Sequence, residues 1–352
     1  TGFSVASHKT AYGVSQVVIS HDGKYVAVSG SHFVSLLNDN ASLLWTFEIY
    51  DIVNSVSISG DGAYVVAGTE GNRIYLFDGR DGRVLWSYGT AGPVLTIKIS
   101  SDGQYVAAGI FEGIVYLLER DGELVWSYKA GDITAILSVA ISNDGSRVVA
   151  GSSNNKVILL SSESPIPMWT YETRDYVRSV AITPNGRFLA AGTNDSYVHF
   201  FSSDSSSPEW SYRTEGAVRS VAVSSTGRVI VCGSYDGRIY LFEKSNSTPR
   251  WTYDTGDMVL SVSLSDDDIR LIAGGASMKT YILDVRDGSL EFSYDSKFLI
   301  NSTSMSGGGL VMVVGGDSAV QIFTNVELEK PSSTEWVNQT LLFVVVTVVV
   351  AT

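Results

Sequence analysis

Cysteine and charge are both scarce in this chain. Cys232 is the single cysteine among 352 residues, which excludes an intrachain disulfide framework and a cluster of cysteine metal ligands. Only 17% of the residues are charged and 44% are hydrophobic, so the chain is too apolar to be disordered. Acidic residues outnumber basic ones by 37 to 24, for a net charge of −13. A surface of that sign repels phosphate backbones, and we therefore expect no nucleic-acid partner.

Helical periodicity and metal-binding patterns are also missing. No stretch before Thr340 keeps the 3.6-residue period of an amphipathic helix over a dozen residues. The Asp-rich turns fit no calcium-loop pattern, Asp266-Asp267-Asp268 included, and turn chemistry explains them. The histidines share no spacing that would build a zinc or copper site, whether at His8, His21, His32 or His199. We expect no metal and no cofactor.

What the chain does contain is one phrase repeated eight times: a strand, a turn, a second strand ending in glycine, and a third strand. The glycines that close the second strands recur with a period close to 41, at Gly30, Gly68, Gly109, Gly151, Gly192, Gly233, Gly274 and Gly315. Most copies carry an Asp-Gly or Asn-Gly turn before that strand, as at Asp22-Gly23 and Asn185-Gly186. Such turns between apolar runs are the strongest short-range signal of a β-hairpin.

Each copy supplies four strands. The pattern predicts first strands over 14–19, 53–58, 94–99, 136–141, 177–182, 218–223, 259–264 and 300–305. The second strands are apolar on both faces, as expected of strands enclosed by neighbouring sheets. An aromatic residue marks the fourth strand in seven places: Trp45, Trp86, Trp126, Trp169, Trp210, Trp251 and Phe292. We predict an all-β fold, an eight-bladed β-propeller of four-stranded antiparallel blades, with a C-terminal apolar segment.

The repeat resembles the WD-repeat and pyrroloquinoline-quinone-type (quinoprotein) propeller families over roughly residues 3–325, in the manner of an archaeal-type surface protein. LFDGRDGRVLWSYGT, LLERDGELVWSYKAG and LDVRDGSLEFSYDS look like the tryptophan-docking repeat of the quinoprotein class. That resemblance implies a Trp that docks on the next blade after an Asp-Gly turn. The Gly-His and Trp-Asp dipeptides of true WD repeats are absent.

The two chain ends compete for the last blade. Residues 1–325 are expected to form the propeller, with an N-terminal strand around Phe3 closing the eighth blade. Residues 326–340 are a linker or stalk, or else an extra outer strand that carries Trp336. Counting both Phe3 and Trp336 gives nine candidate outer strands for eight blades.

The apolar tail, residues 341–352, runs from Leu341 through Val350 to the last residue. Two main interpretations remain open. About 20 apolar residues are needed for a helix to span a bilayer, so a dozen suggests a truncated membrane anchor. A Val-rich run also suits a β-strand that pairs with a sister subunit. A frayed tail is the third and least favoured interpretation, because twelve exposed apolar residues would aggregate. Thr1 at the start fits a chain whose secretion signal has been removed, or one cut from a longer sequence.

Candidate ligand-binding residues lie on the first strands. One column of that strand is variable while its neighbours are nearly uniform: Ser15, Asn54, Leu95, Leu137, Arg178, Arg219, Leu260 and Asn301. Arg178 and Arg219 come from adjacent blades and could together hold an anion at the channel mouth, or pair locally with Asp175 and Glu215. Lys98 stands in a column otherwise filled by Val, Ser and Ala. We take Arg178, Arg219, Asn54 and Lys98 as the candidates.

The repeat pattern also indicates which functions the chain can have. Its loops are short for a cofactor roof, and the adjacent Cys pair of several quinoprotein dehydrogenases is missing. We expect a non-enzymatic, secreted or cell-surface propeller that binds proteins, identical subunits included, or a membrane through its tail. Sequons at Asn40, Asn194, Asn246 and Asn338 favour a glycoprotein, and Asn301 is the least suited of the five. The alternative is a quinoprotein-like enzyme, or a propeller binding a small anion or sugar at the channel mouth.

Overall fold

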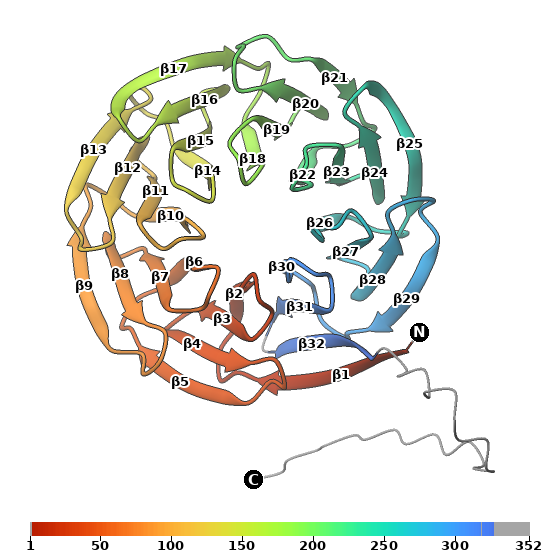
Figure 1. Ribbon diagram of the computed structural model, residues 1–352, viewed down its shortest axis with the longest axis horizontal. Helices are drawn as coiled ribbons and strands as arrows, with labels where there is room; N and C mark the ends of the chain where they lie inside the picture. Colours follow the sequence, from red (N-terminus) through yellow and green to blue (C-terminus); the bar gives the residue numbers. More distant parts are fainter. Residues whose placement is uncertain (1, 318, 327–352) are drawn as a thin grey trace, which may run out of the picture.

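The computed structural model describes residues 2–317 and 319–326, and these form a ring of eight four-stranded antiparallel sheets around a central channel (Figure 1). The predicted eight-bladed propeller is confirmed. Blade one contains β2 to β5, and the blades then follow the chain to blade seven with β26 to β29. Trp336, Leu341, Val350 and the sequon at Asn338 lie outside the described residues.

The innermost strands line the channel. They are β2 (Val14–Ile19), β6 (Val53–Ile58), β10 (Val94–Ile99), β14 (Ile136–Ile141), β18 (Val177–Ile182), β22 (Val218–Val223), β26 (Val259–Leu264) and β30 (Ser302–Met305). Seven of them have the predicted bounds. The eighth begins two residues later than predicted, at Ser302, so Asn301 precedes the strand.

The second and third strands carry most of the buried side chains. The second strands are β3 (Tyr25–Gly30), β7 (Tyr64–Thr69), β11 (Tyr105–Ile110), β15 (Arg147–Ser152), β19 (Phe188–Thr193), β23 (Val229–Ser234), β27 (Arg270–Gly275) and β31 (Val311–Gly316). The third strands are β4 (Phe33–Asn38), β8 (Arg73–Asp78), β12 (Ile114–Glu119), β16 (Lys156–Ser161), β20 (Tyr197–Ser202), β24 (Arg238–Glu243), β28 (Lys279–Asp284) and β32 (Ala319–Val326). Cys232 on β23 is fully buried, and burial raises the pKa of its thiol.

The outer strands form the rim. They are β5 (Leu43–Glu48), β9 (Val84–Gly89), β13 (Leu124–Lys129), β17 (Ser164–Glu172), β21 (Trp210–Arg213), β25 (Asn246–Asp254), β29 (Leu290–Asp295) and β1 (Gly2–Lys9). β1 pairs antiparallel with β32, so the first strand of the chain is the outer strand of blade eight. Figure 1 shows the two side by side, red against blue, where the ring closes.

A ring of hydrogen bonds joins the inner strands of all eight blades. In each blade, the side chain at the third position of the inner-strand repeat accepts a bond from a backbone N–H of the next blade, at 2.9 to 3.3 Å. The acceptors are Gln16, Ser55, Thr96, Ser138, Ser179, Ser220, Ser261 and Ser302. Ser302 bonds to Val17, so the ring continues from blade eight to blade one. The short polar side chains of this column therefore satisfy inner-strand N–H groups that the sheets leave unpaired.

The outer wall is closed by aromatic side chains. Each of the six tryptophans among the described residues donates its indole N–H to a carbonyl oxygen of the following blade, at 2.7 to 3.1 Å. Trp45, for example, bonds to Gly79 and packs over Gly82 and Phe77. Phe292 fills the same place between blades seven and eight, against Phe323 and Phe3. The tryptophan docking implied by the family resemblance is thus present in the chain.

Candidate functional site

The propeller has two faces of opposite character. The top face carries the connections from each outer strand to the next inner strand and the turns between second and third strands, for example residues 130–135 and 111–113. The bottom face carries the Asp-Gly turns between first and second strands and the turns between third and outer strands. Because successive strands are antiparallel, all connections of one kind lie on one face.

Eight large apolar side chains are exposed on the top face. They are Tyr12, Tyr50, Ile52, Phe111, Ile133, Tyr176, Met258 and Met278, and Tyr50 and Ile133 are as open to solvent as in an extended chain, at 101% and 105%. The bottom face exposes only Ile269 and Leu310 among the described residues of this kind. The remaining exposed apolar side chains lie on the third and outer strands. The two faces therefore differ in how much large apolar side chain they expose.

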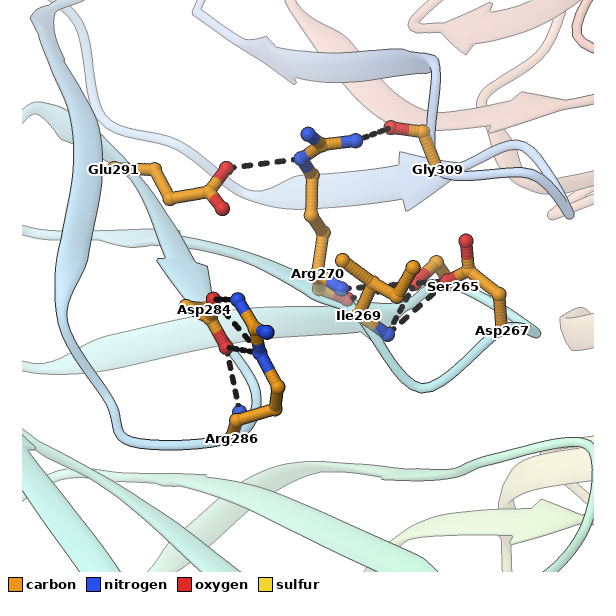
Figure 2. Close-up of polar contacts among 8 residues, drawn as sticks. All are labelled: Ser265, Asp267, Ile269, Arg270, Asp284, Arg286, Glu291 and Gly309. Atoms are coloured by element: carbon orange, nitrogen blue, oxygen red, sulfur yellow. Dashed lines mark hydrogen bonds and ion pairs between the residues drawn. The ribbon is translucent and has the colours of Figure 1, made fainter. Parts of the chain in front are cut away.

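The bottom face instead satisfies its own polar groups. In Figure 2, the Ser265 hydroxyl bonds to Asp267, whose carboxylate also accepts the N–H of Ile269. Arg270 donates to Glu291 at 2.9 Å and to the carbonyl of Gly309 in blade eight. The Ser-x-Asp turn recurs in blades one to four, with Thr183 and Asn185 in blade five. These carboxylates therefore serve turn geometry, as expected from the sequence.

Figure 2 also shows Arg286 donating hydrogen bonds to the carboxylate of Asp284 from two of its guanidinium nitrogens. The side chain of Asp284 is 7% exposed, and the hydrogen bonds from Arg286 lower the pKa of its carboxyl. Asp78 is held in the same way by Arg80 in blade two, with a pKa lowered to about 2. Residues 2–317 and 319–326 contain no group of three or more His, Cys, Asp or Glu side chains placed to hold a metal.

The variable column lies at the top mouth of the channel. In seven blades the pairing of inner and second strands shifts register at this position, so the variable residue is a bulge with no partner on the second strand. A bulge re-aims a side chain and leaves it free of the ladder. Variation at this unpaired position therefore costs the sheet little, which explains why this column varies while the paired positions beside it are nearly uniform.

Two members of this column bridge blades. The amide of Asn54 donates to the carbonyl of Val94 in blade three at 3.0 Å, and that of Asn301 donates to Val14 in blade one at 3.4 Å. Asn54 thus has a structural contact, and its role as a ligand-binding residue stays a prediction.

The two candidate arginines have different surroundings. Arg178 donates from Nε to Asn194 at 2.7 Å, and Asn194 in turn donates to Asp175 at 2.7 Å. The guanidinium of Arg178 also lies 5.9 Å from the ring centre of Tyr235 in blade six. Arg219 is exposed. Glu215, its expected local partner, instead binds Arg238 at 2.8 Å. No contact joins Arg178 to Arg219, and a shared anion site stays a prediction.

Lys98 faces the bore of the channel. A cavity of about 350 Å³ there is lined by inner strands of seven blades, and Lys98 is its one charged lining residue; the others include Val18, Ala181 and Ser263. Burial lowers the pKa of Lys98, and no neighbouring charge offsets that effect. The role of Lys98 as a ligand-binding residue stays a prediction.

The sequons fall in different surroundings. Asn40 and Asn246 are exposed, in the turn before β5 and at the start of β25. The side-chain amide of Asn194 is already hydrogen-bonded to Arg178 and Asp175.

The described part of the chain contains no apolar helix of membrane-spanning length.

One further site was missed from the sequence, at the seam between blades eight and one. On β1, Ala6 pairs with Ile322 of β32. The equivalent position is a tryptophan in blades one to six, such as Trp86 opposite Leu76, and a phenylalanine in blade seven. Two residues later, where the other outer strands have Tyr or Phe, stands His8. The sequence held a signal, since Ala6 and not Phe3 lies 17 residues before the turn glycine Gly23. Phe3 packs instead on the other side of the sheet, against Phe292.

Comparisons with known proteins support the architecture. Two overlapping segments, residues 31–182 and 176–338, match a family model described as "Outer membrane protein assembly factor BamB". No curated protein matches. Of 1929 matching chains of solved structure, one is Sqt1 of Chaetomium thermophilum, solved bound to the N-terminus of the ribosomal protein L10. It is similar over 92% of this chain and 99% of its own, with a TM-score of 0.80 and 17% identity. A likeness at that identity shows the fold alone.

Proposed function

Because this chain belongs to the repeat family described as outer membrane protein assembly factor BamB, we propose that it is a non-enzymatic β-propeller that binds a protein partner on its top face. The observation that carries the proposal is the difference between the faces. Eight large apolar side chains are exposed on the top and two on the bottom. The likeness to Sqt1, a propeller solved with a bound protein segment, supports protein binding as the use of such a surface.

The top face has the mixed chemistry of a protein-binding surface. Tyr176 and Ile133 are exposed beside charged groups of both signs, among them Asp132 and Arg174. Aromatic, Met and Arg side chains are enriched at the buried centres of protein interfaces. A rigid ring of eight blades can hold these side chains in place without ordering loops on binding, which lowers the entropic cost of association.

Site-directed photocrosslinking in the native cell tests this function. A photoreactive phenylalanine derivative at Ile133 or Tyr176 should capture a discrete protein partner. The same group at Ile269 or Leu310 on the bottom face is the matched control and should capture none. Equal capture from both faces, or none from the top face, would refute the proposal.

The finer part of this proposal concerns location and attachment. We propose that the protein is secreted to the cell surface, glycosylated, and attached through its apolar tail, residues 341–352, to a membrane or to a sister subunit. The support is the Val-rich sequence of that segment and the exposed sequons Asn40 and Asn246. Electron microscopy of the intact protein in detergent-free buffer should show polymers if the tether joins subunits. Partition into detergent without polymers would indicate an anchor, and dispersed monomers with no lipid affinity would exclude both.

A second candidate function is the binding of a small anion in the channel, favoured by the amine of Lys98 in the channel wall. Replacing Lys98 by Met keeps much of the side-chain volume and removes the cation. Phosphate or acetate should then lose its ability to raise the melting temperature of the protein. An unchanged anion effect in Lys98→Met would exclude this function.

A further inference from the structure

The seam between blades eight and one is closed on the inside and open on the outside. On the inside, the bond from Val17 to Ser302 continues the ring seen at every other junction. On the outside, a cavity of about 390 Å³ lies between β1 on one side and β4 and β5 on the other. Its volume is within the range of protein pockets that bind small ligands, about 300 to 1,000 Å³.

The cavity exists because both walls lack the aromatic residues of the repeat. On the blade-eight wall, His8 replaces the tyrosine that other outer strands present, such as Tyr88. On the blade-one wall, Ser35 occupies the column of Tyr116, Tyr240 and Tyr281. At the junction of blades two and three, Tyr88 and Tyr116 meet edge to face at 5.9 Å. At the seam these two columns supply the smaller imidazole of His8 and the hydroxyl of Ser35 instead of two phenol rings.

The lining groups suit an aromatic ring with a polar substituent. Phe33 is buried at the base, and Tyr12 stands edge to face with His32 at 5.4 Å. Lys9 and Glu48 add one charge of each sign, and Ser35 and Thr46 share a hydrogen bond of 2.8 Å within the lining. Aromatic rings favour edge-to-face neighbours, and a phenol or indole keeps a hydrogen-bonding group for the polar wall.

The pocket is continuous with the proposed binding face. Tyr12 and Tyr50, two of the exposed side chains of the top face, also line it. A partner lying on the top face could therefore insert a side chain into the seam. Buried aromatic anchors of this kind contribute much of the affinity of protein interfaces.

We propose that the seam pocket formed by His8, His32, Phe33, Ser35 and Glu48 is a binding site for an aromatic side chain, a phenol or an indole, presented by the protein partner. The partner's ring takes the place that the chain's own aromatic pairs take at the junction of blades two and three. The inference rests on the proposed function for its partner, but the pocket can be tested without one.

The first test uses small probes on the full chain. N-acetyl-tyrosinamide and N-acetyl-tryptophanamide should bind at one site per chain, measured by calorimetry or saturation-transfer NMR, with N-acetyl-leucinamide at least tenfold weaker. Ser35→Tyr restores the repeat residue and should weaken probe binding at least tenfold. Ser127→Tyr is the matched control, because Ser127 is exposed on β13 of a closed junction. Equal binding of the leucine probe, or full binding to Ser35→Tyr, would overturn the inference.

The second test builds the site elsewhere. Tyr88→His with Tyr116→Ser reproduces the seam pair between blades two and three and should raise the number of probe sites from one to two. If that variant does not fold, the effect of Ser35→Tyr on probe binding still tests the proposal. Probe binding that persists when no partner is captured on the top face would support the pocket and refute the proposed function. Partner capture that is unaffected by Ser35→Tyr, with no probe binding, would support the proposed function and refute the pocket.

Discussion

At seven blade junctions of this propeller the outer strand presents a tryptophan or phenylalanine to the next blade, and at the eighth it presents Ala6 instead. Between blades one and two, Trp45 and Phe47 face Phe77 and Tyr75. Between blades eight and one, Ala6 and His8 face Leu37 and Ser35. The inner hydrogen-bond ring is the same at both. The difference teaches that the hydrogen bonds of the inner strands can close the ring even where the outer strand supplies no tryptophan or phenylalanine.

The largest effect should come from opening a filled junction at its tryptophan. Trp126→Ala removes a side chain that is 5% exposed, together with its bond to the carbonyl of Ser162. We expect a loss of about 3 to 5 kcal/mol in the free energy of unfolding, as for other buried aromatic truncations. Denaturant titration followed by circular dichroism measures it. Leu124→Ala on the same strand is exposed and should change stability by less than about 0.5 kcal/mol; equal losses would show that the aromatic seal is unimportant.

A second effect concerns histidine in a closed junction. His199 occupies the tyrosine column between blades four and five, and burial lowers its pKa from 6.5 to about 4. The folded state therefore holds the neutral ring, and stability is present above pH 6.5 and lost as the pH falls towards 4. Linkage at about 1.4 kcal/mol per pKa unit gives a loss of about 3 kcal/mol over that range.

His199→Tyr should flatten this part of the pH profile. The measurement is the difference in unfolding free energy between the two proteins at pH 7 and pH 4. Burial also lowers the pKa of His8 at the open seam, so His8→Tyr is the parallel variant. An identical pH profile for wild type and His199→Tyr would contradict the assignment.

The inner ring should respond alike at closed and open junctions. Ser138→Ala leaves the N–H of Val180 without its acceptor, and Ser302→Ala does the same to Val17. Each should cost about 1 to 2 kcal/mol, because a buried donor is left unpaired. Thermal or denaturant unfolding of both variants compares them. A loss confined to one of the two would show that the seam is not closed in the same way on the inside.

The smallest effect should come from filling the seam. Ser35→Tyr is expected to raise the unfolding free energy by about 0.5 to 1 kcal/mol, since filling a cavity commonly stabilises a fold. The exposed control Ser127→Tyr should leave it nearly unchanged. Differential scanning calorimetry resolves the shift. A destabilised but folded Ser35→Tyr would mean that the seam cannot accept the ring that the repeat uses elsewhere.

The strands could be predicted closely because their signals are local. An alternating apolar run between an outer-strand connection and an Asp-Gly turn defines β18, Val177–Ile182, with the predicted bounds. The side-chain contacts of the candidate site could not be predicted from the sequence. Arg178 binds Asn194 sixteen residues away, and Asn54 reaches the carbonyl of Val94 in another blade. Such partners depend on a bulge and on the spacing of neighbouring sheets, which no local pattern specifies.

The sequence by itself determined the number of blades, the strands and the aromatic column, because each depends on residues within one repeat of about 41. Only the tertiary structure decided which residue of the first strand takes the tryptophan place. The aromatic Phe3 suggested itself, but pairing with β32 puts Ala6 there. The same closure brings His8 opposite Ser35 and blade eight against blade one, across nearly the whole length of the chain. The seam pocket is a property of that closure, since neither wall forms a cavity until the ring joins its ends.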